Sequence, residues 1–269
     1  NHLNIDNSGF FRHSVIEDYL ELLGIKKEDI PSFIDKPKDT DEEDPLHLDN
    51  LGKAVEITYN MLSTTILPVV YIQPDCDVDG FTSSSILFNY LKHRWPQLEI
   101  KYKLHDGKEH GINNDFIDDD VKLVFIPDAG SNDIEEQKKL IARGKTVIIL
   151  DHHIQDIENP YAIIINNQTS DYPNKELSGV GIVWQFCRYL DSLLKQNKAD
   201  DFLDLVALGL TGDMMSLTSI ETKHLINKGF DPDNIHNPYI YGMWQKNSFK
   251  LGDHINSIDA AFYIVPMIN

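Results

Sequence analysis

The chain has 269 residues, 41% hydrophobic and 25% charged, as in globular proteins with one large domain or two small ones. Its 24 basic and 43 acidic residues give a net charge of −19, which argues against a duplex-DNA-coating protein, because phosphate binding depends on Lys and Arg. The longest apolar stretch is about seven residues, whereas a membrane helix needs roughly 20, so we expect no membrane segment. The two cysteines lack zinc-type spacing, which argues against a disulfide scaffold or a cysteine-zinc site and fits a cytoplasmic setting.

The N-terminal part of the chain has a helical pattern. Apolar residues recur at helical spacing over residues 13–23 and again over residues 51–62. Between them, Asp35 to Asp44 is an acid-rich loop that contains Pro37 and is the best candidate for a linker. We therefore expect residues 1–60 to form an N-terminal helical extension and residues 61–269 to form the main domain.

From about residue 66 the pattern changes to strands that alternate with helices. Such alternation predicts βαβ units, and hence an α/β fold with a mainly parallel sheet flanked by helices. The expected strands cover residues 67–73, 98–104, 121–127, 145–150 and 162–166. The expected helices cover residues 81–94, 134–143, 178–194, 202–210 and 219–228.

The first predicted strand of this region runs into three alternating acids, Asp75, Asp77 and Asp79, followed by Gly80. Carboxylates this close raise one another's pKa unless a cation is present. The alternative is a solvated acidic turn with helix-capping acids. An EF-hand is disfavoured, because Ile86 stands where the twelfth-position glutamate of such a loop belongs.

The helix that follows these acids is a candidate phosphate site. Helix N-termini favour anions, and Gly80 would permit close backbone approach. We therefore expect Gly80, Ser83 and Ser84 to contact a substrate.

Three further segments end in acids or imidazoles: Asp128 and the triplet Asp151-His152-His153 each follow a predicted strand, and Asp213 follows a helix. Taken singly, these could be turn, cap or surface-loop residues. Asp213 needs a compensating partner, since an acid at a helix C-terminus opposes the helix dipole. Together they form a carboxylate-rich set that suits Mn²⁺ or Mg²⁺ rather than structural zinc. Two such ions can activate a water and stabilise the leaving oxygen of a phosphodiester.

In their order along the chain, these motifs resemble the DHH phosphoesterase superfamily, and within it RecJ-type single-strand-specific exonucleases. Competing motifs such as GxxxxGK[ST], GxGxxG and HExxH are absent from the sequence. The resemblance extends over roughly residues 44–269. Its supporting segments are residues 44–55, 109–113, 172–181 and 264–269.

The resemblance implies two Mn²⁺ or Mg²⁺ ions, with Asp128 as the bridging ligand and Asp75 as a further or supporting ligand. His153 would face the scissile phosphate, and Asp151 would orient a histidine or backbone. The remaining implied ligands are Asp77, Asp79, His152 and Asp213.

The chain departs from the pattern of this superfamily at two positions. Gln73 stands where many relatives have a histidine, and a neutral amide is a weaker ligand. Met267 stands where the nuclease branch usually has an arginine. Relatives also continue into a DHH-associated domain, which we expect beyond Asn269. Cys76 lies between the implied ligands, and we expect it to be a small packed residue.

The function implied by the resemblance is a two-metal phosphodiesterase, most closely a 5′-to-3′ exonuclease on single-stranded DNA that acts in repair or recombination. One alternative keeps the chemistry and takes short oligonucleotides, cyclic dinucleotides or pyrophosphate as substrate. Another is a non-catalytic replication scaffold, against which the retained acids argue.

Overall fold

The computed structural model describes residues 13–34, 38–107 and 109–268. The strands are β1 Val69–Ile72, β2 Ile100–Tyr102, β3 Val121–Pro127, β4 Thr146–Asp151 and β5 Ile163–Asn166. The helices before and between the strands are α1 His13–Leu22, α2 Ile30–Ile34, α3 Leu51–Leu62, α4 Val78–Arg94 and α5 Ile134–Ala142. The helices after the strands are α6 Gly179–Leu194, α7 Leu203–Gly212, α8 Ile220–Gly229, α9 Pro238–Lys246, α10 Ser248–Leu251 and α11 Ser257–Tyr263.

The five strands form one sheet in the order β2-β1-β3-β4-β5, and each neighbouring pair is parallel. The predicted α/β class is therefore confirmed. From β1 the chain crosses to β2 on one side, whereas β3 pairs with β1 on the other side. The direction of winding thus reverses between β1 and β3. In open α/β sheets, ligands bind at the carboxyl edge at this switch point.

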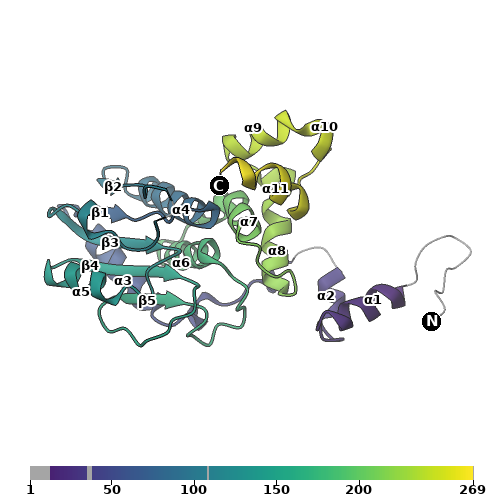
Figure 1. Cartoon of the computed structure of the whole chain (residues 1–269), viewed down its shortest axis with the longest axis horizontal. Coiled ribbons are helices and arrows are strands. Elements are labelled where there is room, and N and C mark those ends of the chain that lie inside the picture. The colour runs from purple at the N-terminus through teal and green to yellow at the C-terminus, as the bar shows by residue number, and fades with distance from the viewer. Residues whose placement is uncertain (1–12, 35–37, 108, 269) are drawn as a thin grey trace, which may run out of the picture.

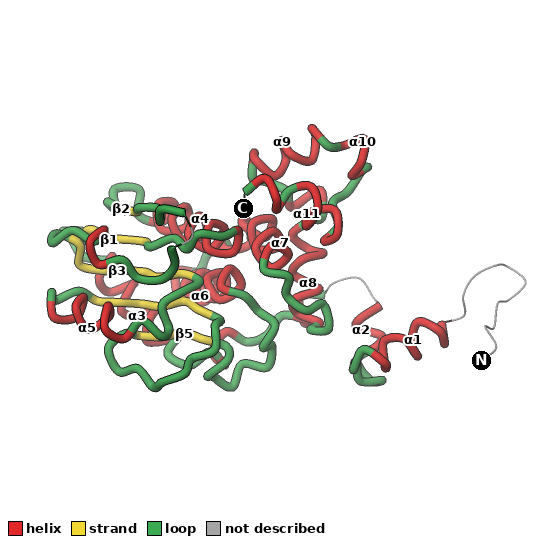
Figure 2. Tube along the Cα trace, viewed as in Figure 1, coloured by secondary structure: helices red, strands yellow, loops and turns green. Residues whose placement is uncertain are grey.

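Alternate residues of the strands pack into two separate cores, because successive side chains of a strand point to opposite faces. Val70, Ile72 and Phe125 belong to the larger core, which they share with α3, α4, α6 and α7. Tyr71 and Val124 belong to the smaller core, which the sheet shares with α5. Figures 1 and 2 show the sheet with its helices at one end of the molecule and the helices α7 to α11 next to them.

The third helix belongs with the sheet. Leu51, Ala54 and Val55 of α3 are fully buried in the larger core, and Asn50 Nδ2 donates a hydrogen bond to the carbonyl of Ile164 at 2.9 Å. The predicted boundary between residues 60 and 61 falls within α3. In contrast, α1 and α2 lie apart from the sheet beyond α8 (Figure 1). Residues 1–12 of the predicted extension and residues 35–37 of the predicted linker lie outside the described residues.

The helices α9 to α11 had no counterpart among the predicted elements. The start of α9 does carry a sequence signal, because Asn237 caps it by accepting hydrogen bonds from the N–H groups of Tyr239 and Ile240, and Pro238 follows as its first residue.

Among the helices of the described residues, none is long and apolar enough to cross a bilayer.

Candidate metal centre

Four segments place acids or imidazoles at one edge of the sheet. The turn after β1 carries Asp75, Asp77 and Asp79, β3 is followed by Asp128, β4 ends at Asp151 before the two histidines, and α7 is followed by Asp213. His152 lies among them, with its Nε2 atom 3.3 Å from Asp128 Oδ1, 3.5 Å from Asp213 Oδ2 and 3.9 Å from Asp79 Oδ2. The side chain of His152 is 11% exposed.

Two carboxylate oxygens at this centre are buried without a hydrogen bond. Asp79 and Asp128 are each about 1% exposed. Within the described part of the chain, Asp79 Oδ2 and Asp128 Oδ1 accept no hydrogen bond. A buried carboxylate that lacks a partner is costly, and a bound cation removes that cost. These two oxygens, with His152 and Asp213 beside them, therefore fit a metal ion.

The pKa values of these acids shift in the direction that burial and crowding dictate. Burial, and then the charge of Asp128, raises the pKa of Asp79 well above its ordinary value. Burial likewise raises the pKa of Asp128, and the charges of Asp77, Asp151 and Asp75 add to that rise. Burial also raises the pKa of Asp213, against the neighbouring His152. Without a cation, the ionised form of these carboxylates is therefore unfavourable.

The N-terminus of α6 fixes the positions of Asp79 and Asp128. Asp79 Oδ1 accepts hydrogen bonds from the Ser178 hydroxyl and from the Val180 N–H, both at 3.0 Å. A Cβ atom at Gly179 would lie 2.4 Å from Asp128 Oδ1 and 2.8 Å from Asp128 Cα, so this position requires glycine. The contribution of Ser178 and Gly179 was not predicted, although this segment was among those that resembled the superfamily.

Asp128 has an uncommon backbone conformation for a residue with a side chain. Its φ angle is 65°, in the left-handed region, and its N–H donates a hydrogen bond to the Leu150 carbonyl at 2.8 Å. Strain of this kind persists where the surroundings impose it and is concentrated at functional sites.

Asp151 holds His153 and the backbone after β4. Its Oδ1 atom accepts hydrogen bonds from His153 Nδ1 at 2.8 Å and from the N–H of His152 at 2.7 Å. Its Oδ2 atom accepts one from the Ser131 N–H at 3.1 Å. Burial alone would raise the pKa of Asp151, but these hydrogen bonds hold it at about 2. The Asp151 hydrogen bond raises the pKa of His153 to about 9, so this imidazole carries a positive charge at neutral pH.

The two acids at the start of the turn, Asp75 and Asp77, form a further group of potential ligands with Asp128. Asp75, Asp77 and Asp128 each offer an oxygen within 4.8 Å of the others, as do the ligand atoms of Asp79, His152 and Asp213. Asp128 also belongs to such a group with His152 and His153. Asp128 is therefore common to two adjoining groups of potential ligands.

Gly80, Ser83 and Ser84, for which we predicted substrate contacts, lie in the first two turns of α4, and these contacts remain a prediction. Asp77 occupies the N-terminus of α4 itself, because its Oδ1 atom accepts the Gly80 N–H at 2.9 Å. Gly80 is required there because a Cβ would lie 2.6 Å from Asp75 Cβ. Ser83 is fully buried, and Ser84 faces a separate cavity of about 230 Å³ between α4 and β2. The helix start is thus filled by the protein's own carboxylate.

Gln73 is also buried, and its amide contacts residues that follow β2. Its Nε2 atom lies 3.2 Å from His105 Nε2 and 3.2 Å from the Lys103 carbonyl oxygen. His105 was not among the predicted residues.

A hollow of about 390 Å³ opens beside the acids, lined by residues that include Asp75, Asp128, Asp151, His153 and Gly130. A ligand in this hollow would touch the carboxylates directly.

The fold and the site define a class: a parallel α/β domain with a cluster of carboxylates and histidines at its switch point that could hold a metal ion. A family model described as the DHH family, N-terminal domain, matches residues 69–210, which is more than half of the chain. The chain belongs to the DHH family.

Two curated relatives have names that describe single-strand-specific exonucleases. A Bacillus subtilis (strain 168) protein named provisionally as an SPbeta prophage-derived single-strand DNA-specific exonuclease, YorK, is 39% identical over 243 residues, which are 88% of this chain and 42% of that protein. The single-stranded-DNA-specific exonuclease RecJ of the same strain is 29% identical over 67% of this chain and 23% of its own length. This chain therefore spans less than half the length of these curated relatives.

Solved structures share the fold. A crystal structure of the exonuclease RecJ bound to manganese has a TM-score of 0.70 at 20% identity, over 82% of this chain and 57% of that one. RecJ from Thermus thermophilus in complex with Mn²⁺ has a TM-score of 0.68 at 19% identity, over 81% of this chain and 32% of that one.

Proposed function

We propose that this chain hydrolyses phosphodiester bonds, as a 5′-to-3′ exonuclease on single-stranded DNA that depends on two Mn²⁺ or Mg²⁺ ions. The observation that carries the proposal is the pair of buried oxygens of Asp79 and Asp128 that accept no hydrogen bond from the described residues, with His152 and Asp213 beside them. The names of YorK and RecJ support the single-stranded DNA substrate. A role in DNA repair or recombination is part of the same proposal.

The ions would be held by the two adjoining groups of acids. One group comprises Asp75, Asp77 and Asp128, and the other comprises Asp79, His152 and Asp213 together with Asp128. This donor set, rich in hard oxygens with a single imidazole, suits Mn²⁺ or Mg²⁺. Ions bound there would activate water and offset the charge of the phosphate oxygens.

His153 is the residue that we propose for direct contact with the phosphate. Its ring is more than half exposed, and Asp151 keeps it protonated through the 2.8 Å hydrogen bond. A positively charged imidazole at the rim of the 390 Å³ hollow can donate a hydrogen bond to a phosphate oxygen as charge develops there. Asp151 acts on this contact as a positioning residue.

Cleavage assays with three substrates test the proposal. With Mn²⁺ present, we expect the protein to release nucleotides from a long 5′-phosphorylated single strand, and to act less on the matching duplex or a dinucleotide. The Asp128→Asn variant should lose at least 100-fold in rate. Cleavage of the dinucleotide alone would contradict the exonuclease and support a phosphoesterase that acts on short oligonucleotides. An unchanged rate in Asp128→Asn would refute the metal centre as the site of hydrolysis.

A further inference from the structure

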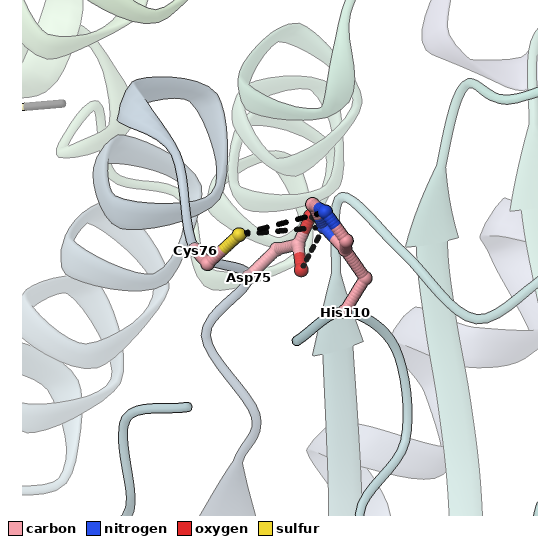
Figure 3. A group of neighbouring side chains, drawn as sticks. All are labelled: Asp75, Cys76 and His110. Atoms are coloured by element: carbon pink, nitrogen blue, oxygen red, sulfur yellow. Dashed lines mark hydrogen bonds and ion pairs between the residues drawn. The ribbon is translucent and has the colours of Figure 1, made fainter. Parts of the chain in front are cut away.

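A second cluster of ligand-type side chains borders the carboxylates at the turn after β1. It comprises Asp75, Cys76 and His110, which point toward one another in Figure 3. His110 Nδ1 lies 3.4 Å from Cys76 Sγ and 3.2 Å from Asp75 Oδ2. Unlike the main centre, this cluster combines a thiol, an imidazole and a carboxylate.

The distances between these atoms match those between ligands of one tetrahedral ion. Zn–S and Zn–N bonds of about 2.3 and 2.0–2.1 Å place sulfur and nitrogen about 3.5 Å apart at a tetrahedral angle, and nitrogen and oxygen about 3.4 Å apart. The observed separations in the cluster are 3.4 and 3.2 Å. An ion could therefore enter with small side-chain movements.

The backbone around the cluster is held independently of any ion. Asp75 is 5% exposed in the turn. The loop that carries His110 is anchored on its other side, because the Ile112 N–H donates to Asp133 Oδ2 at 2.8 Å and His105 Nε2 lies 2.9 Å from the Gly111 carbonyl oxygen. The three side chains are thus brought together by the fold, which lowers the entropy cost of binding an ion.

We propose that Asp75, Cys76 and His110 form a binding site for a thiophilic divalent cation, with Zn²⁺ as the expected occupant. Thiolate and imidazole ligands favour Zn²⁺ over Mg²⁺ or Mn²⁺, so the site selects a different ion from the oxygen-rich centre beside it. The His110 side chain is 64% exposed, which leaves a fourth coordination position open to water. The expectation that Cys76 is merely a packed residue is thereby revised, since it is partly exposed and faces His110.

The site would also act on the main centre through Asp75, which belongs to both groups of ligands. A Zn²⁺ ion that engages the Asp75 carboxylate withdraws it from Asp77 and Asp128, so that Zn²⁺ lowers the affinity of the main centre for Mn²⁺. This consequence rests on the proposed function, whereas the binding of Zn²⁺ does not.

Cobalt spectroscopy tests the site without reference to activity. Co²⁺ replaces Zn²⁺ in such sites, and a cysteine ligand adds an intense thiolate-to-cobalt charge-transfer band that carboxylates and imidazoles do not produce. We expect this band on titration of the purified chain with Co²⁺, and we expect Zn²⁺ to abolish it. Absence of the band would overturn the proposal and leave the cluster as an ion pair of His110 and Asp75.

Four variants identify the ligands. Cys76→Ser should abolish the band, and His110→Asn should weaken Co²⁺ binding at least tenfold. Cys187→Ser is the matched control, because the second cysteine is fully buried in the α6 core and should leave the band unchanged. A band that survives Cys76→Ser would overturn the site. In Asp128→Asn the band should persist, which separates failure of this site from failure of the proposed hydrolytic centre.

The effect of Zn²⁺ on the main centre is tested by measuring Mn²⁺-supported hydrolysis. Zn²⁺ should reduce Mn²⁺-supported hydrolysis by the wild-type protein at least tenfold at one equivalent, and Cys76→Ser, compared with its own zinc-free rate, should resist this inhibition. Equal inhibition of both proteins would refute the role of the cluster in it.

Discussion

Individual residues of the centre are positioned by hydrogen bonds that leave selected oxygens free. Asp79 uses one oxygen to bind the start of α6, while its other oxygen is buried without a hydrogen bond in the described structure. Asp151, in contrast, has both oxygens engaged. The sequence presents both residues as acids beside a strand, yet their surroundings give them opposite pKa shifts. The raised pKa of Asp79 suits this residue for binding a cation, and the lowered pKa of Asp151 suits it for holding His153.

Replacing Asp79 with asparagine should stabilise the metal-free protein. The raised pKa of Asp79 shows that its charge is unfavourable there, and an amide would supply a donor to the unpartnered oxygen of Asp128. We expect the free energy of unfolding in EDTA to rise by about 1–3 kcal/mol. The further stabilisation that Mn²⁺ gives the wild-type protein should disappear. Denaturant unfolding measures both effects, with the exposed Asp253→Asn as control. A less stable metal-free Asp79→Asn would contradict this account.

The Asp151–His153 pair should be visible in a titration. In the metal-free protein, NMR of the His153 ring should give a pKa of about 9, because Asp151 favours the charged imidazole. Since this value lies above the ordinary 6.5, the stability from the pair is complete between about pH 3.8 and 6.5 and is lost as the pH rises through about 9. The lowered pKa of Asp151 sets the acid limit at about 2. In Asp151→Asn the His153 pKa should fall toward 6.5, and an unchanged value would refute the pairing.

At the scale of elements, the site is built where the N-terminus of α6 and the C-terminus of α7 meet the carboxyl ends of β1, β3 and β4. Close approach of α6 to Asp128 depends on Gly179. Asp213 at the end of α7 lies beside His152, whose Nε2 atom is 3.5 Å from Asp213 Oδ2. The site is thus formed by residues at the ends of both strands and helices.

Gly179→Ala should displace Asp128 and weaken the metal centre. The added Cβ would lie 2.4 Å from Asp128 Oδ1, a distance that requires movement of the carboxylate or of α6. We expect Mn²⁺ affinity to fall by at least tenfold by calorimetry, with a loss of about 1–3 kcal/mol in stability. Gly242→Ala in α9 is the matched control, because its added Cβ meets nothing within 4 Å. That change should keep Mn²⁺ binding intact and raise stability by about 0.5–1 kcal/mol. Equal Mn²⁺ affinity in the two variants would count against the packing argument.

Much of this arrangement could be predicted from the sequence, because apolar runs that end in acids identify buried strands and the edge at which they stop. The order of the strands brings Asp75, Asp128 and His152 to the same edge, as expected for parallel strands. The sequence could not show which hydrogen bonds and contacts the polar side chains form in the folded chain. At the start of α4, for example, only the structure shows that Asp77 accepts the Gly80 N–H. Similarly, Cys76 and His110 are 34 positions apart, and only the fold brings them together.

At the scale of the whole molecule, the sheet, α3 and the helices of the larger core form one packed unit, whereas Ile25, Ile30 and Phe33 form a small separate cluster with α1, α2 and Ile220 of α8. The family match begins at residue 69, after α3. We propose that α3 folds as part of the catalytic unit and that the N-terminal extension proper ends before it.

Leu51→Ala tests this assignment. Leu51 has no exposed surface, so its truncation should cost about 2–5 kcal/mol of the free energy of unfolding. The whole unit should lose stability in one transition, because α3 and the sheet share a core. Leu46→Ala is the control, since this side chain is 56% exposed and its loss should cost less than about 0.5 kcal/mol. A cost below about 1 kcal/mol for Leu51→Ala, or a separate early transition, would place α3 outside the unit.

The central claim is that Asp79, Asp128, His152 and Asp213, with the acids of the first turn, hold two hard divalent ions that share Asp128. Calorimetric titration of the metal-free chain with Mn²⁺ tests it most directly. The account predicts two ions bound per wild-type chain and loss of both in Asp128→Asn, with secondary structure retained by circular dichroism. A wild-type chain that binds no Mn²⁺, or an Asp128→Asn variant that still binds two ions with unchanged affinity, would contradict it.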